Sequence, residues 1–226
     1  MTRTLSRRSL LAVGTAATAG VLAGPGAAAA PPQDPWRRLM DGNARFVAGK
    51  QIHPHQQLAW RETLVNGQQP FACVLGCADS RVTPELVFDH GLGDLFTVRA
   101  VGEVLDDAIV GSIEYAVDHL GVPLVVVLGH ARCGAVQAAI DLVAGRGPIT
   151  GAVNTVARAI EATVRATPAL AEEAAFVQAC VHNQAKRIRA ELTERSATIG
   201  KAVADRQIDI VAAVYDLRGG QVQKLD

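Results

Sequence analysis

The chain has 226 residues, enough for one domain with a substantial apolar core. Its 22 basic residues balance its 22 acidic residues, and no long run of basic residues occurs, which disfavours nucleic-acid binding. The first thirty residues carry three arginines and no acid, so the remainder has 19 basic against 22 acidic residues and is mildly acidic.

The N-terminus has the pattern of an export signal. A basic start is followed by a weakly apolar run over 10–22 and then by small residues typical of a cleavage site. The run is too short to span a bilayer, which takes about 20 apolar residues. The adjacent Arg7 and Arg8 are typical of twin-arginine signals. We therefore predict a cleaved twin-arginine signal over 1–30 and export of the folded protein to the periplasm or the medium, without a membrane anchor after cleavage.

Residues 31–226 are predicted to form one mature domain in which helical and strand patterns alternate. In chain order, we predict a helix over 35–47, a helix over 58–65, a strand over 71–76, a strand over 95–98, a helix over 107–120, a strand over 124–128, a helix over 136–143, helices over 153–166 and 170–192, and a strand over 208–215. Apolar strands that alternate with helices indicate an α/β fold with a mainly parallel sheet flanked by helices. A glycine pair at 219 and 220 then returns the chain, which predicts an antiparallel C-terminal edge.

Metal-ligand residues gather in two segments that follow predicted strands. Ligands of parallel α/β sheets bind beyond the carboxyl ends of the strands. Cys77 follows one strand, and His130 and Cys133 follow another. Two thiolates and one imidazole suit tetrahedral zinc, and an open fourth position is typical of a catalytic site. We predict one zinc ion per chain at these three residues.

Asp79 has two possible roles at that fourth position. It lies two residues after Cys77 and could ligate the same ion. It also lies two residues before Arg81, whose guanidinium could hold the carboxylate in a bidentate pair and leave the site to water. Water on zinc ionises near pH 7 in suitable sites, which would make hydroxide available.

The four cysteines leave an alternative open. In an exported chain they could form two disulfides, including one between Cys77 and Cys133. Cys73 lies in a predicted strand, roughly 13 Å along the strand from Cys77. Cys180 lies in the middle of a predicted helix. We predict that neither Cys73 nor Cys180 is a ligand.

Both segments resemble the signatures of β-carbonic anhydrases. The resemblance is carried by Cys-Ala-Asp-Ser-Arg-Val at 77–82 and by Gly-His-Ala-Arg-Cys-Gly-Ala-Val at 129–136, and it extends through 96–99, 111–117 and 124–128. It implies a parallel core of four strands in the order 2-1-3-4, an intertwined homodimer or a dimer of dimers, and zinc-dependent reversible hydration of carbon dioxide to bicarbonate.

The resemblance also implies residue roles. Cys77, His130 and Cys133 match the zinc ligands, while Asp79 and Arg81 match the pair that orients the attacking hydroxide.

Further matches concern the substrate. Gln68 matches a glutamine that hydrogen-bonds substrate in one branch of the family. Phe96, Val101 and Tyr115 match residues that line a narrow apolar cleft, partly across the dimer interface, although Phe96 and Val101 would equally suit an ordinary core.

His119 matches a proposed proton-shuttle position, and an exposed histidine at a helix end is the alternative. Ala100 and Glu103 stand where the family usually has amides, which puts the local hydrogen bonding in question.

Three other functions remain open from the residues. The same zinc site could hydrolyse carbonyl sulfide or carbon disulfide. A protein that binds zinc or bicarbonate without catalysis is the second alternative, and the intact Asp79 and Arg81 argue against it. A thiol-disulfide protein is the third, and it requires oxidation of Cys77 or Cys133.

Overall fold

The computed structural model describes residues 33–226, so the expected signal over 1–30 lies outside the described residues. These residues form one compact unit around a five-stranded sheet in the order β2-β1-β3-β4-β5. The strands are β1 (Ala72–Gly76), β2 (Leu95–Arg99), β3 (Leu124–His130), β4 (Asp209–Tyr215) and β5 (Val222–Leu225). The first four are parallel in the expected order 2-1-3-4, and β5 is the expected antiparallel return beside β4.

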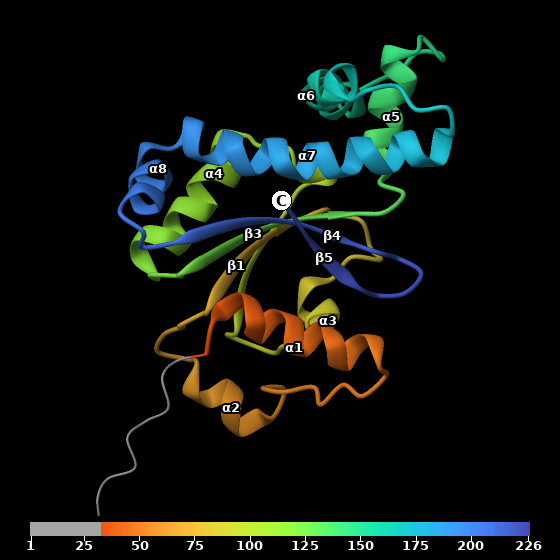
Figure 1. Ribbon diagram of the computed structural model, residues 1–226. Coiled ribbons are helices and arrows are strands. Elements are labelled where there is room, and N and C mark those ends of the chain that lie inside the picture. The colour runs from red at the N-terminus through yellow and green to blue at the C-terminus, as the bar shows by residue number, and fades with distance from the viewer. Residues whose placement is uncertain (1–32) are drawn as a thin grey trace, which may run out of the picture. The chain divides into compact units, whose positions relative to one another are not determined.

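Helices cover both faces of the sheet (Figure 1). One face carries α1 (Pro35–Val47), α2 (Leu58–Thr63) and α3 (Pro84–Val87). The other carries α4 (Asp107–Glu114), α5 (Gly134–Val143), α6 (Val153–Ala166), α7 (Glu173–Arg195) and α8 (Ala197–Ala204), together with a 3-10 turn (Val101–Glu103) and a π-helical turn (Tyr115–His119). No helix among residues 33–226 is long and apolar enough to cross a membrane.

The strands are apolar on both faces because each face meets a helix layer. All five residues of β1 are buried. Cys73 and Leu75 pack into the core under α7, whereas Ala72 and Val74 pack into the core against α1. Burial on both faces explains why the strands read as unbroken apolar runs, which is the pattern of parallel strands.

Most expected helices lie where the periodicity places them. α1 has the predicted bounds: the side chain of Asp34 accepts from the N–H of Arg37, and Pro35 supplies the first turn. The helix expected from residue 170 begins at Glu173 instead. Residues 167–172, which include Pro168, lie outside any helix. α8 was not predicted, and the hydroxyl of Ser196 caps it by accepting from the N–H of Ile199.

Candidate metal centre

Cys77, His130 and Cys133 meet at the carboxyl edge of the sheet. Cys77 follows β1, His130 is the last residue of β3, and Cys133 is the N-cap of α5. Because β1 and β3 are neighbouring parallel strands, their ends bring the three side chains together. The ligand atoms all lie within 4.8 Å of one another, and all three residues are buried. His130 was expected in a loop but ends β3, since β3 runs two residues past the predicted end at residue 128.

His130 is oriented as a metal ligand. Its Nδ1 lies 3.0 Å from the carbonyl oxygen of Ala131, so Nδ1–H donates there and Nε2 keeps its lone pair. Nε2 is buried and has no hydrogen-bond partner among residues 33–226. A buried nitrogen without a partner is costly unless something binds it. A cation at the centre of the three side chains would satisfy this atom.

The two thiols alter one another's pKa. The thiol of Cys133 donates to the sulfur of Cys77, and this lowers the pKa of Cys77 to about 4, with smaller help from His130 and from the N–H of Gly102. Gly102 N lies 3.3 Å from the Cys77 sulfur. The same hydrogen bond raises the pKa of Cys133, and burial raises it further. A divalent cation that displaced the proton of this hydrogen bond would hold both groups as thiolates, which zinc sites require. The donor set and its chemistry therefore fit zinc.

Asp79 is paired with Arg81. Nε of Arg81 donates to Oδ1 at 2.9 Å, and Nη2 donates to Oδ2 at 2.6 Å. The Arg81 guanidinium holds the pKa of Asp79 well below its usual range, and the backbone N–H of Arg81 adds to the effect. Oδ2 lies 3.9 Å from Nε2 of His130. Two roles were considered for Asp79, a metal ligand or a partner of Arg81. In the structure its carboxylate is paired with Arg81 and lies beside the metal centre.

Arg99 belongs to the site, although no role was predicted for it. Its Nε donates to the carbonyl of Cys77 at 2.9 Å, and its Nη2 donates to the carbonyl of Asp79 at 2.6 Å. Arg99 ends β2 and pairs in register with Gly76, which places its side chain beside the segment that follows β1. Arg99 thus fixes the backbone that carries both Cys77 and Asp79.

Glu103 replaces one of the expected amides and lies against the centre. It is buried, with a carboxyl oxygen, Oε1, that has no partner among residues 33–226. Burial raises the pKa of this carboxyl well above its usual range, and the neighbouring Cys77 thiolate raises it further. The turn before it depends on Gly102, which has φ of +68° and whose added Cβ would lie 2.7 Å from Ile160 and 2.8 Å from Ala135.

A small cavity of about 260 Å³ opens beside Cys77 and Asp79. Its other walls are apolar or small residues: Ala78, Val101, Gly134, Ala135, Ala138, Val153, Val156 and Ala157. Such a lining suits a small molecule without strong hydrogen-bonding groups. Val101 lies in this wall, as the sequence suggested for a cleft residue.

The other expected substrate residues lie elsewhere in the chain. Phe96, Tyr115 and His119 form an aromatic row, with ring centroids 6.1 and 5.0 Å apart, outside the cavity. The His119 side chain is 63% exposed. Gln68 is exposed and precedes β1, whereas Cys77 follows it. The five residues of β1 span roughly 17 Å, so Gln68 and Cys77 lie at opposite ends of this strand.

Neither remaining cysteine joins the centre. All four cysteines are reduced, so the disulfides considered from the sequence are not formed. Burial inside β1 raises the pKa of Cys73 to about 12, and Cys180 is buried in α7.

The chain is similar to known carbonic anhydrases. A family model described as "Carbonic anhydrase" matches residues 72–222. Carbonic anhydrase 2 of Mycobacterium tuberculosis is 44% identical over 190 residues, which cover 82% of this chain and 89% of that protein. The carbonic anhydrase of Mycolicibacterium smegmatis is 42% identical over 192 residues, with 83% and 90% covered.

Solved structures agree with the sequence relatives. The β-carbonic anhydrase of Coccomyxa, solved in complex with acetazolamide, has a TM-score of 0.64 at 26% identity, covering 73% of this chain and 75% of that one. A tetrameric β-carbonic anhydrase of Sordaria macrospora shares the fold, with a TM-score of 0.68 at 24% identity over 84% of this chain and 96% of that one.

Proposed function

We propose that this chain catalyses the reversible hydration of carbon dioxide to bicarbonate and a proton. The ground is that the chain belongs to the β-class carbonic anhydrase family. The observation that carries the proposal is the unpartnered Nε2 of His130, which lies within 4.8 Å of the sulfurs of Cys77 and Cys133 and beside a carboxylate held by an arginine. The chain is an enzyme of this family. What remains to be tested is the reaction and the ion.

We propose that Cys77, His130 and Cys133 hold one zinc ion per chain. Zinc in such a site lowers the pKa of water towards neutrality and so supplies hydroxide as the nucleophile. The hydrogen bond from Nδ1 of His130 to Ala131 fixes the ring so that Nε2 faces the centre. The N–H of Gly102 supports the Cys77 thiolate from the other side.

Asp79 and Arg81 orient the nucleophile. The pair with Arg81 keeps Asp79 ionised, so its carboxylate can only accept a hydrogen bond. An attacking oxygen that donated its hydrogen to Oδ2 would be held with a lone pair towards the substrate. Arg81 also holds the carboxylate on its own guanidinium, away from an ion that the three ligands would bind, and Arg99 holds the backbone that carries Asp79.

Carbon dioxide would lie in the cavity beside Cys77 and Asp79. The wall that includes Val101 is apolar, and carbon dioxide has no net dipole to be hydrogen-bonded. Once bicarbonate has formed, a proton must leave for the solvent. We propose His119 as the group that passes it on, because its imidazole is exposed and can exchange a proton with the solvent.

We propose that the working unit is a homodimer or a dimer of dimers. Gln68 cannot reach the centre of its own chain, and the Phe96–Tyr115 pair lies outside that chain's cavity. Tyr115 is 47% exposed, so it presents apolar surface that a second chain could cover. In this arrangement Gln68 would hydrogen-bond substrate, and Phe96 and Tyr115 would line the cleft, in the second chain's site.

The test uses the mature protein, residues 31–226. We expect one zinc per chain by elemental analysis and rapid hydration of carbon dioxide in a stopped-flow assay. Carbonyl sulfide and carbon disulfide are assayed in parallel, and turnover of either in preference to carbon dioxide would replace the proposed substrate. A zinc-loaded protein without any turnover would indicate a binding protein.

We also propose that the protein is exported by the twin-arginine route. The support is the pattern around Arg7 and Arg8 in residues 1–30. This route carries folded proteins, which would allow the zinc site to be completed before export.

A further inference from the structure

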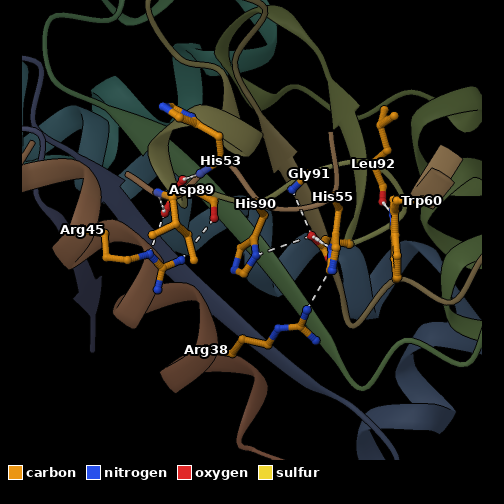
Figure 2. A network of polar contacts seen from close by, with 11 residues as sticks. Arg38, Arg45, His53, His55, Trp60, Asp89, His90, Gly91 and Leu92 are labelled. Atoms are coloured by element: carbon orange, nitrogen blue, oxygen red, sulfur yellow. Dashed lines mark hydrogen bonds and ion pairs between the residues drawn. The ribbon is translucent and has the colours of Figure 1, made fainter. Parts of the chain in front are cut away.

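Two carboxylates, Asp89 and Asp94, organise the loop that precedes β2 (Figure 2). Because β2 is parallel to β1, the start of β2 lies at the opposite end of the strands from Cys77. One of the two carboxylates, Asp94, accepts hydrogen bonds at both oxygens. Oδ1 accepts from Arg38 at 2.9 Å, and Oδ2 accepts from His55 at 2.7 Å and from the N–H of Gly91 at 2.9 Å. The Asp94 side chain is only 6% exposed, so these contacts lie inside the protein.

The contacts of Asp94 extend to one end of the segment 64–71, which connects α2 to β1. His55, which bonds Asp94, stacks on the indole of Trp60 with ring centroids 3.8 Å apart. Trp60 lies in α2, just before this segment, and its Nε1 donates to the carbonyl of Leu92 at 2.8 Å. The start of the segment is therefore attached to the loop that Asp94 organises.

The other end of the segment is attached to Asp94 as well. The N–H of Phe71 donates to the Asp94 carbonyl at 2.9 Å. The guanidinium of Arg38 lies 3.8 Å from the centre of the Phe71 ring, and the ring of His90 lies edge-on to it at 4.9 Å. His90 Nδ1 is 3.7 Å from Oδ2 of Asp94. Both side chains that enclose Phe71 thus face the same carboxylate.

Gln68 lies between these two attached ends and is itself exposed. We infer, resting on the proposed role of Gln68 in a second chain's site, that Asp94 is a positioning residue. It fixes one end of the 64–71 segment through His55 and Trp60. It fixes the other end through Arg38 and Phe71. The position of the Gln68 amide against the substrate depends on both attachments.

The second carboxylate provides a matched control. Asp89 accepts from Nε of Arg45 at 2.6 Å and from the N–H groups of Ile52 and His53 at 3.1 and 3.0 Å. Its side chain is 1% exposed, so it is at least as buried as Asp94. The hydrogen bonds of its carboxylate go to 45–53. The partners of the Asp94 carboxylate differ, because His55 stacks on Trp60 and Arg38 lies over the ring of Phe71.

The experiment compares Asp94→Asn with Asp89→Asn in the zinc-loaded full mature chain. Both changes remove one buried charge that is paired with an arginine. We expect Asp94→Asn to lower kcat/KM for carbon dioxide about tenfold through a raised KM, because a small displacement of a binding group weakens substrate positioning. Zinc content and kcat should stay close to those of the unmodified chain, and Asp89→Asn should leave KM within about twofold.

A double-mutant cycle with Gln68→Ala separates positioning from general destabilisation. If Asp94 acts through Gln68, Asp94→Asn should have little further effect on kcat/KM once Gln68 is alanine. An equal loss in both backgrounds, or an equal loss from Asp89→Asn, would overturn the inference. So would unchanged kcat/KM in Gln68→Ala, because Asp94 would then have no substrate contact to position.

Two further measurements keep the test decisive. If Asp94→Asn does not fold, Trp60→Phe replaces it, since phenylalanine keeps a ring over His55 and loses only the donor to Leu92. If the unmodified chain does not hydrate carbon dioxide, the proposed function fails, and amide hydrogen exchange over 64–71 still tests the positioning. Faster exchange there in Asp94→Asn than in Asp89→Asn supports it, and equal exchange contradicts it.

Discussion

The side chains of Asp79 and Arg81 form a bidentate ion pair, in which Nε lies 2.9 Å from Oδ1 and Nη2 lies 2.6 Å from Oδ2. The arginine lowers the pKa of the carboxyl and holds the carboxylate on its guanidinium. Two variants follow from this arrangement.

Asp79→Asn should keep zinc and lose turnover. The amide cannot act as an acceptor-only partner, so the attacking oxygen loses its orientation. We expect kcat/KM to fall by about 100-fold or more at every pH, with one zinc per chain retained. Elemental analysis measures the zinc content, and stopped-flow hydration of carbon dioxide from pH 6 to 9 measures kcat/KM. Wild-type rates in this variant would show that Asp79 is structural.

Arg81→Ala tests the same pair from the other side. Without the guanidinium, the nearest cation for Asp79 is the metal, which its Oδ2 can approach from beside His130. Turnover should fall while zinc stays bound. The rate should stay below that of the unmodified chain over the whole pH range. An unchanged rate and pH profile would mean that the carboxylate does not need Arg81.

Cys77→Ser should remove most of the zinc and with it the activity. Cys73→Ser is the matched control, since it makes the same atomic change in the same region of the chain but inside β1. It buries a hydroxyl among apolar side chains and should lower the free energy of unfolding by about 1–3 kcal/mol while leaving the zinc content unchanged. Full zinc in Cys77→Ser would rule out this residue as a ligand.

Gly102→Ala should destabilise the protein by about 2–4 kcal/mol, because it combines a left-handed backbone with contact on Ile160 and Ala135. The N–H that supports the Cys77 sulfur would move with the backbone, so zinc should also be lost faster to a chelator. Gly121→Ala is the control: φ there is +64° but nothing lies within 4 Å of the added Cβ. It should cost about 1 kcal/mol and leave zinc release unchanged. Urea unfolding and chelator kinetics decide between them.

Asp94 should contribute to acid sensitivity. Burial alone would raise the pKa of its carboxyl, but the donors on His90, Gly91 and His55 outweigh burial and lower it. A lowered pKa in the folded state stabilises the protein above the unfolded value of about 3.9, and this stability is lost as pH falls towards the folded value. The difference in free energy of unfolding between the unmodified chain and Asp94→Asn should therefore be constant from pH 7 to about 5 and shrink below about pH 4. A difference that does not change with pH would contradict this.

The export proposal has its own test. Replacing Arg7 and Arg8 together by lysine keeps the charge but removes the guanidinium pair of the signal. The precursor should then stay in the cytoplasm, as fractionation and immunoblotting of the full-length chain would show. Unchanged export would indicate the general secretory route.

The parallel core could be predicted from the sequence because β1 and β3 are buried on both faces. Strands of this kind appear in the sequence as continuous apolar runs. The three ligands could also be predicted, since the carboxyl ends of neighbouring parallel strands must meet. α8 was missed because the predicted helix ended at residue 192, three residues before the end of α7, and the residues that follow were left without an element. Ser196 separates α7 from α8 by a single residue and caps α8.

Other parts of the site could not be read from local patterns. Arg99 contacts Cys77 and Asp79 only because β2 pairs with β1, and its position in the chain gives no sign of that. The attachment of Phe71 to Asp94 and Arg38 likewise joins residues that are far apart in sequence. The place of Gln68 at the opposite end of β1 from Cys77, by contrast, follows already from the strand predicted over 71–76, and the structure confirms it.

The ligands come from two strand ends, and Cys77 and Cys133 are 56 residues apart in the chain. Bringing them together closes a long loop, and the entropy of that closure must be offset by the pairing of β1 with β3 before the ion gains its ligands. Of the three proposed ligands, only His130 and Cys133 are close enough in sequence to chelate an ion in the unfolded chain. Binding of the proposed zinc would therefore be a late event in folding, and a chain that was unfolded for transport across a membrane would lose the ion on the way.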